Sequence, residues 1–386
     1  MDVPAGGKAA VITGNFPGFE ALTTPRAVVS EAVLAANIAH MQSIAAAGRV
    51  TLHPHIKTHK SLALARRQLD AGASGLTASR PEEAAMFIAA SLGPVTLAYP
   101  IIEPSRAARL LRLGADHGVA LRFIVDSETG IAALKAASRV SGLDAESFVK
   151  VDVGLHRCGI DPLAPGGIAV VQQLASSSIG FLGLLAHAGN AYAAGSRDGV
   201  VKIAQHEREL LLGLRDRLQT LGIEVPNISV GSTPTALANA GFDGFDELRP
   251  GNYVFLDLSA VRLGIAARDD IALAVVATVL SANAEFSIID AGSKTLSSDL
   301  GPHGTKNTLS FGEVWRPGWH ASLEIIRLSE EHGFVANDGP PLRPGTKVLV
   351  LPNHACPVAN LAPGLTMLAP DGSTELAVDA ASARLL

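Results

Sequence analysis

Short runs of β-branched and apolar residues recur along the first two thirds of the chain, and stretches rich in Ala, Leu, Glu and Arg separate them. The runs predict eight strands, near Leu52–Lys57, Gly75–Ser79, Val95–Tyr99, Arg122–Asp126, Phe148–Val153, Phe181–His187, Asn227–Val230 and Glu247–Phe255. This alternation is typical of a closed (β/α)8 barrel, and the alternative is an open doubly wound sheet. No Gly-x-Gly-x-x-Gly motif follows an early strand, so the dinucleotide-binding form of that open sheet loses support.

The pattern changes after about Gly264. Further strands are predicted at Ile271–Leu280, Phe286–Asp290, His320–Leu328 and Lys347–Leu351, separated by Gly, Pro, Asn and Asp clusters without a strong helix. We therefore expect an α/β protein of two domains. A (β/α)8 barrel would span residues 25–264, and a smaller all-β domain would span residues 265–386 together with the N-terminal residues 1–24.

Composition narrows the class of protein. The 386 residues are 48% hydrophobic, which is enough for a full core, and the net charge of −5 gives no basic surface for nucleic acid or anionic membranes. Only two cysteines occur, so a disulfide scaffold is excluded and a reducing compartment is expected. The longest apolar run is too short to span a bilayer. These features predict a soluble cytoplasmic protein.

The segment Thr51–Lys60 places a lysine, Lys57, at the end of a predicted strand among three histidines and a second lysine. A lysine at a strand end can lie in a pocket, where partial desolvation lowers its pKa. The neutral amine then becomes a nucleophile that can hold an aldehyde as a Schiff base. The alternative is a solvated basic loop, because most lysines are exposed. Polar groups at the other predicted strand ends favour the pocket.

Two of those strand ends carry candidate chemistry. His187 is a candidate acid/base or metal-proximal group, and the alternative is a hydrogen-bonded structural histidine. In the loop Gly231–Thr235, the glycine lets the backbone approach a ligand, and Ser232 and Thr233 supply hydroxyl groups. This loop is a candidate phosphate cradle, and the alternative is an ordinary helix N-cap.

His354 and Cys356 follow the predicted strand Lys347–Leu351. In an extended chain, residues two apart point to the same side, so both side chains could face one ion. Imidazole and thiolate together suit Zn²⁺ best among common metals, although Mn²⁺ or Mg²⁺ would fit an oxygen-rich open site. Two protein ligands would leave positions open for water or substrate, as in a catalytic metal site. The alternative for Cys356 is a buried free cysteine.

Together these motifs resemble the family of D-threonine aldolase and D-serine dehydratase, which has the alanine racemase-like fold (fold type III). The resemblance covers nearly the whole chain from about Thr24. It is carried by Pro54-His-Ile-Lys-Thr-His-Lys60, Asp152 with Arg157-Cys-Gly, Ala186-His-Ala-Gly-Asn, Gly231-Ser-Thr-Pro-Thr, Arg249-Pro-Gly-Asn-Tyr253, Asp290-Ala-Gly, Ser329-Glu-Glu-His-Gly and Pro352-Asn-His-Ala-Cys.

The resemblance implies pyridoxal 5′-phosphate as the cofactor, with Lys57 forming the Schiff base and His187 lying near the substrate hydroxyl. Further cofactor-binding positions that it implies are Arg157, Asn190, Gly231, Ser232, Thr233 and Tyr253. It also implies that His354 and Cys356 bind a divalent metal beside that hydroxyl, and that the chain forms a homodimer. Leu185 stands where some relatives carry a tyrosine near the cofactor ring, so the contact to the pyridine nitrogen is unassigned.

The implied activity is that of a lyase on D-3-hydroxy amino acids, and the configuration rests on the resemblance alone. The His-x-Cys motif favours β-elimination by a D-serine or D-threo-3-hydroxyaspartate dehydratase, whereas the following Pro357 and Asn360-Leu361 are similar to the aldolases. Retro-aldol cleavage to glycine and an aldehyde therefore stays open. An amino-acid racemase and a non-enzymatic pyridoxal phosphate carrier are lower alternatives, and the predicted β domain speaks against the carrier.

Overall fold

The computed structural model describes residues 12–302 and 309–381. The chain forms two compact units, Ile38–Tyr253 with Asp379–Leu386, and Met1–Asn37 with Val254–Val378. We call the first the barrel unit and the second the β unit. Within the described ranges, no helix combines the length and the apolar character needed to cross a lipid bilayer.

The barrel unit holds eight parallel strands in the order β2-β9-β8-β7-β6-β5-β4-β3. Their bounds are β2 (Thr51–Leu52), β3 (Leu76–Ala78), β4 (Val95–Leu97), β5 (Leu121–Val125), β6 (Glu146–Val151), β7 (Gly180–Ala186), β8 (Asn227–Val230) and β9 (Glu247–Leu248). A parallel bridge between His55 and Thr77 joins the two ends of this order. The predicted (β/α)8 barrel with an additional β domain is thus confirmed.

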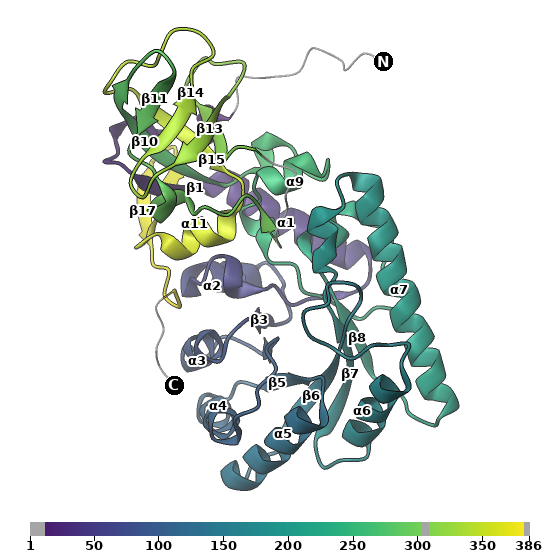
Figure 1. Ribbon diagram of the computed structural model, residues 1–386. Helices are drawn as coiled ribbons and strands as arrows, with labels where there is room; N and C mark the ends of the chain where they lie inside the picture. Colours follow the sequence, from purple (N-terminus) through teal and green to yellow (C-terminus); the bar gives the residue numbers. More distant parts are fainter. Residues whose placement is uncertain (1–11, 303–308, 382–386) are drawn as a thin grey trace. The chain divides into compact units, whose positions relative to one another are not determined.

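Helices lie around the outside of these strands (Figure 1). Their bounds are α2 (Leu62–Asp70), α3 (Pro81–Ala89), α4 (Pro104–His117), α5 (Glu128–Ser141), α6 (Pro165–Ala175), α7 (Arg197–Thr220) and α8 (Thr233–Ala238). Local sequence sets their ends. Pro81 begins α3 with Glu82 and Glu83 in the first turn, and left-handed Gly118 ends α4.

Two predicted strands end at least five residues before the expected C-terminus. The strand expected over Leu52–Lys57 ends at Leu52, and the chain then forms a 3₁₀ turn, η3 (Ile56–Thr58), that carries Lys57. Pro54 supplies no backbone N–H to continue the ladder. The strand expected over Glu247–Phe255 likewise ends at Leu248, before Pro250 and Gly251, and Tyr253 lies on η5 (Asn252–Val254).

The β unit contains a nine-stranded sheet in the order β11-β14-β13-β12-β15-β10-β1-β16-β17. The bounds are β1 (Arg26–Ser30), β10 (Leu273–Ala282), β11 (Phe286–Ile289), β12 (Gly312–Trp315), β13 (Leu323–Leu328), β14 (Gly333–Ala336), β15 (Lys347–Pro352), β16 (Leu365–Ala369) and β17 (Gly372–Leu376). An additional pairing of β11 with β10 closes the first six strands of this order into a small barrel. Three short helices belong to this unit, α9 (Leu258–Arg262), α10 (Ser293–Leu296) and α11 (Ala355–Leu361), and α1 (Glu31–Ala47) follows β1 directly.

Charged groups occupy part of the interior of the barrel unit. The Arg122 guanidinium donates to Glu247 at 2.5 Å and lies 2.9 Å from Nδ1 of His53. Glu247 also accepts a hydrogen bond from Ser229 at 2.8 Å, and Ser229 accepts one from Arg249 at 2.6 Å. Each charged side chain in this hydrogen-bonded network has a partner, so these polar groups can be buried. This network ends at Arg249, which also lines a pocket of the barrel unit.

Candidate active site

A small pocket of about 30 Å³ lies at the C-terminal ends of the strands of the barrel unit. Its lining residues are His55, Lys57, Ala98, Lys150, Arg157, Leu185, His187, Gly231 and Arg249. They come from β2, β4, β6, β7, β8 and β9 or from the segments that directly follow these strands. This is the rim at which barrels of this kind place their chemistry.

The pocket is rich in basic groups. Burial, followed by the charge of Arg249, lowers the pKa of Lys150 to about 7. Burial, followed by the charge of Lys57, lowers the pKa of both His55 and His187 well below the usual histidine value. Both rings are therefore neutral near pH 7, whereas arginine stays charged. The arrangement attracts an anion and provides neutral imidazoles that can exchange protons.

One carboxylate lies close to this basic group. Glu207 of α7 is 2% exposed and accepts a hydrogen bond from the backbone N–H of Ala188. Burial raises its pKa to about 7, although the charges of Lys150 and Arg249 oppose that shift. Glu207 and Lys150 therefore interact as a buried pair whose protonation changes near neutrality.

Gly231 has a structural reason to be glycine. Its φ is +141°, and a Cβ there would lie 2.7 Å from the backbone nitrogen of Arg249. The glycine thus permits close approach of the loops that follow β8 and β9. His187 lies beside the loop after β8, because its Nδ1 is 2.7 Å from the carbonyl oxygen of Gly231. The ring orientation is therefore set by the backbone of the candidate phosphate loop.

Ser232 and Thr233 are both engaged locally. Ser232 is the N-cap of α8, and its Oγ accepts the N–H of Thr235 at 3.3 Å. Thr233 Oγ1 accepts the N–H of Tyr253 at 3.1 Å, so its own proton remains available as a donor. Both interpretations of this loop from the sequence thus apply: it caps a helix, and it offers hydroxyl groups.

Asn190 lies on η4 (Gly189–Ala193), and its amide nitrogen would be 3.0 Å from a Cβ added to Gly154. Its buried Oδ1 has no hydrogen-bond partner among the residues that the structure describes. Asn190 does not line the small pocket. It packs instead against the loop after β6, near the segment that leads to Arg157.

Three ionisable lining residues were missing from the sequence-predicted site: His55, Lys150 and Arg249. Lys150 carried a usable signal, because it lies between Val149 and Val151 in a strand whose burial on both faces gives it no route to solvent. Arg249 is 5% exposed, but its pocket position depends on the turn after β9, which the sequence predicted as a continuous strand.

In the β unit, His354 and Cys356 share a side-chain hydrogen bond. His354 is the N-cap of α11 and Cys356 lies in its first turn, so the expected extended geometry is wrong. The helical turn still brings the two side chains together. Nδ1 of His354 lies 2.7 Å from Oδ2 of Asp299, which leaves Nε2 as the ring atom for a metal. Among the residues described, no cluster of three or more His, Cys, Asp or Glu side chains meets the geometry of a metal site.

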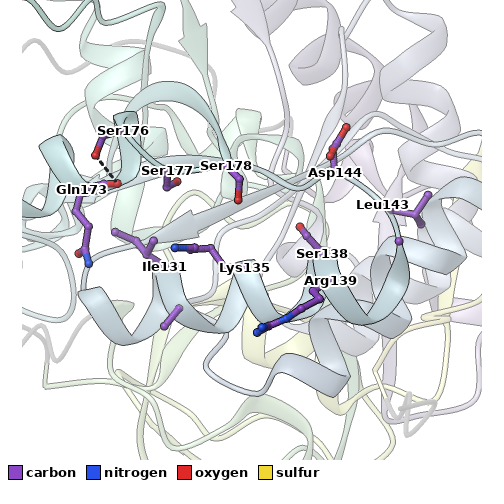
Figure 2. A pocket seen from close by; sticks show the side chains of 12 residues that line it. Ile131, Lys135, Ser138, Arg139, Leu143, Asp144, Gln173, Ser176, Ser177 and Ser178 are labelled. Atoms are coloured by element: carbon purple, nitrogen blue, oxygen red, sulfur yellow. Dashed lines mark hydrogen bonds between the residues drawn. The ribbon is translucent and has the colours of Figure 1, made fainter.

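A wider groove of about 790 Å³ lies elsewhere on the barrel unit, between α5 and α6 (Figure 2). Its polar walls include Lys135 and Arg139 of α5 and Ser176–Ser178 of the loop that precedes β7. That loop enters the N-terminal end of β7, and residues 142–144, which also line the groove, enter the N-terminal end of β6. This is the end of the barrel opposite the Lys57 pocket. Conserved chemistry in such barrels lies at the other end, so volume alone does not identify the active site.

Comparisons with known proteins agree with this geometry. Residues 29–259 match the family model described as alanine racemase, N-terminal domain, and residues 272–368 match the model described as putative serine dehydratase domain. The chain is 36% identical to a D-threo-3-hydroxyaspartate dehydratase from Delftia sp. (strain HT23), over 92% of this chain and 96% of that protein. It is 29% identical to a D-threonine aldolase from Arthrobacter sp., over 91% and 90% of the two chains.

Solved structures show the same relationship. The structure of the Delftia sp. HT23 dehydratase superposes with a TM-score of 0.86 at 33% identity, covering 93% of this chain and 98% of that one. An alanine racemase from Bacillus anthracis superposes with a TM-score of 0.66 at 14% identity, covering 92% and 97%. The second likeness concerns the fold alone.

Proposed function

Because this chain belongs to the family described by the alanine racemase N-terminal domain and the putative serine dehydratase domain, we propose that it is a lyase that uses pyridoxal phosphate and a divalent metal to act on D-3-hydroxy amino acids. Dehydratases and aldolases are both lyases, so the predicted family and enzyme class are confirmed. The family depends on pyridoxal phosphate and its members on a metal. The residue roles below are part of the proposal.

The observation that carries the proposal is the position of Lys57 in a pocket of basic side chains. A solvated basic loop, the alternative for this lysine, does not explain why Lys150, Arg157 and Arg249 line the same small space. Glu207 and Glu247 offset part of this positive charge, and a bound anion would offset more of it. Pyridoxal phosphate supplies an aldehyde for the lysine amine and a phosphate for the cations, so the donor set fits this group.

Lys57 would hold the cofactor covalently, and Arg157 would lie near its ring and phenolic oxygen. Gly231, Ser232, Thr233 and Tyr253 would hold the phosphate, with Asn190 supporting the neighbouring loop. The bound cofactor withdraws electrons from the substrate Cα, which makes bonds to that carbon easier to break. Once the substrate amine has displaced it from the cofactor, the free Lys57 amine would remove the Cα proton, and neutral His187 would exchange a proton with the substrate hydroxyl.

His354 and Cys356 would hold the divalent metal. Their hydrogen bond and the Asp299 carboxylate on the far side of the ring fit a His-Cys ligand pair with a supporting carboxylate. A metal at such a site acts as a Lewis acid toward the substrate hydroxyl. Zn²⁺ suits the thiolate best, and we propose it ahead of Mn²⁺ or Mg²⁺.

Within the lyases we favour β-elimination. The Cα proton and the β-hydroxyl leave together as water, and the remaining enamine is hydrolysed to a 2-keto acid and ammonia. The 36% identity to a D-threo-3-hydroxyaspartate dehydratase supports this choice, as does the His-x-Cys motif. The second candidate is retro-aldol cleavage, supported by the 29% identity to a D-threonine aldolase.

A product assay separates the two reactions. The metal-loaded holoenzyme is supplied with D-serine, D-threonine and D-threo-3-hydroxyaspartate, and ammonia, keto acid and glycine are quantified. We expect ammonia and keto acid in equal amounts and no glycine. Glycine with an aldehyde would replace the dehydratase by the aldolase, and formation of the L-enantiomer alone would replace both by a racemase.

The role of Lys57 is tested by borohydride reduction of the holoenzyme, followed by peptide mapping. We expect a pyridoxyl group on the peptide that contains Lys57, and loss of both the label and the visible absorbance band in Lys57→Ala. Lys135→Ala, which changes an exposed lysine of the same unit, is the matched control and should keep both signals. Labelling of another lysine would contradict the assignment. A homodimer and a cytoplasmic location complete the proposal.

A further inference from the structure

A buried hydrogen-bond chain joins three side chains of the barrel unit. The backbone N–H of Ser61 donates to Nδ1 of His59 at 3.0 Å, and Nε2 of His59 lies 3.1 Å from Oε1 of Gln68. Nε2 of Gln68 donates to the hydroxyl of Tyr253 at 2.9 Å. His59, Gln68 and Tyr253 are at most 2% exposed, so bulk solvent does not reach these side chains.

The direction of this chain follows from its first bond. A backbone N–H can only donate, so Nδ1 of His59 must be an unprotonated acceptor. Burial lowers the pKa of His59 to about 4, so the ring is neutral and carries its proton on Nε2. That proton requires the oxygen of the Gln68 amide as its acceptor, which turns the Gln68 NH₂ toward Tyr253. Every bond therefore runs from His59 toward the phenol.

The phenol oxygen consequently receives a hydrogen bond and keeps its own proton to donate elsewhere. Burial raises the pKa of Tyr253, so this proton stays in place. Among the described residues, the Tyr253 hydroxyl has no acceptor for it. A hydrogen-bond donor without an acceptor costs free energy on a side chain that is 98% buried, unless a ligand accepts from it.

The surroundings of Tyr253 indicate where that acceptor lies. Its backbone N–H donates to Thr233 in the loop after β8. The same turn packs against the segment that carries Lys57, because His55 N–H donates to the carbonyl of Pro250 at 2.9 Å. Tyr253 is thus held between the two segments to which the proposed function assigns the phosphate and the aldehyde.

We infer that His59 and Gln68 are positioning residues that orient the Tyr253 hydroxyl as an obligatory donor to the phosphate of the cofactor. This inference rests on the proposed function, because it requires that pyridoxal phosphate binds. Neither His59 nor Gln68 touches the phosphate. They act by occupying the lone pair of the phenol oxygen, which excludes the orientation in which that oxygen would face the phosphate as an acceptor.

The test compares two probes on the cofactor-depleted full-length chain: pyridoxal phosphate and pyridoxal, which lacks the phosphate. Tyr253→Phe should weaken pyridoxal phosphate by about 10- to 100-fold, the range for one hydrogen bond to a charged group, and leave pyridoxal nearly unchanged. Gln68→Glu should have a similar phosphate-selective effect, because a carboxylate accepts the phenol proton and reverses the last bond. Gln68→Met, which only removes the donor, should have a smaller effect.

The double variant separates orientation from charge. If Gln68→Glu acts through the phenol, it should cause no further phosphate-selective loss in the Tyr253→Phe background. Persistence of the loss there would assign it to repulsion by the new carboxylate and overturn the inference. Equal weakening of both probes by Tyr253→Phe would do the same. The control is Gln42→Met, at a glutamine of the same unit that takes no part in the hydrogen bonds between His59, Gln68 and Tyr253. It should leave the ratio of affinities unchanged.

Two outcomes stay distinguishable from failure of the proposed function. If the wild-type chain binds no pyridoxal phosphate and borohydride labels no lysine, the proposed function itself is wrong. If Lys57 is labelled but the affinity ratio is insensitive to Tyr253 and Gln68, the Schiff base stands, whereas the phosphate contact of Tyr253 and its orientation by His59 and Gln68 are wrong. Thermal unfolding of each variant identifies those that fold. Should Gln68→Glu fail to fold, Gln68→Met tests the orientation, because a phosphate-selective loss in it that disappears in the Tyr253→Phe background supports the inference and no loss overturns it.

Discussion

Two histidines of this molecule occupy opposite electrostatic environments. In the barrel unit, burial and the charges of Lys57 and Lys150 lower the pKa of His187 well below its usual value. In the β unit, burial also favours the neutral ring of His354, but Cys356 and Asp299 outweigh it and raise the pKa to about 10. The first environment attracts anions and the second attracts cations. The difference supports the proposal that a phosphorylated cofactor binds in one unit and a divalent metal in the other.

The largest expected effects test this division directly. Cys356→Ala should lose the divalent metal while Lys57 is still labelled by borohydride, and Lys57→Ala should lose the label while the metal remains. Each change should lower turnover by at least about 100-fold, because Lys57 is the proposed base and Cys356 holds the proposed Lewis acid. Metal content and labelling are measured on the same preparations. Loss of both ligands in either variant would show that the two sites are not independent.

Asp299→Asn tests the proposed metal site around His354 in the β unit. The carboxylate on Nδ1 of His354 orients the ring and increases its basicity, and loss of such a partner typically weakens metal binding by about 10- to 100-fold. Competition with a chromophoric chelator measures the affinity. Asp338→Asn, at a carboxylate of the same unit outside this contact, is the control. An unchanged metal affinity in Asp299→Asn would remove Asp299 from the site.

Lys150→Met tests the basic pocket of the barrel unit, which would bind the phosphorylated cofactor. Because the pKa of Lys150 is about 7, its side chain is charged below that pH and neutral above it. The wild-type chain should therefore bind pyridoxal phosphate about ten-fold more tightly than the variant at pH 6, as one charge-assisted hydrogen bond would cause, and almost equally at pH 8. The ratio of the two affinities cancels the ionisation of the cofactor. A ratio that does not vary with pH would contradict this account.

The smallest effect concerns stability alone. Burial lowers the pKa of His53 to about 4 in the folded chain, against about 6.5 when unfolded. The unfolded chain binds the extra proton between these values, so His53 alone should lower the free energy of unfolding by about 1.4 kcal/mol for each pH unit between 6.5 and 4. In urea titrations at several pH values, His53→Asn should reduce the dependence of the free energy of unfolding on pH by the amount that corresponds to about one proton. Exposed His117→Asn should leave the slope unchanged, and equal slopes for both variants would contradict the assignment.

Much of this architecture was accessible from local sequence. Alternating apolar runs and helical segments predicted the eight barrel strands because parallel strands buried on both faces read as continuous apolar runs. The β unit was harder. Its strands β12, β14, β16 and β17 were not predicted, since they are short and their pairing depends on distant segments. β1 lies in the middle of that sheet, between β10 and β16, which no local pattern indicates.

The chain's residue types alone determined the candidate lysine, the hydroxyl-bearing loop and the His-x-Cys pair, because each is a compact motif with its own chemistry. Tertiary structure decided which groups share a pocket. Lys57, Lys150 and Arg249 meet only because strands far apart in sequence end at one rim. It also decided the state of each histidine, because a pKa depends on burial and on neighbouring charges that the linear order of residues does not contain.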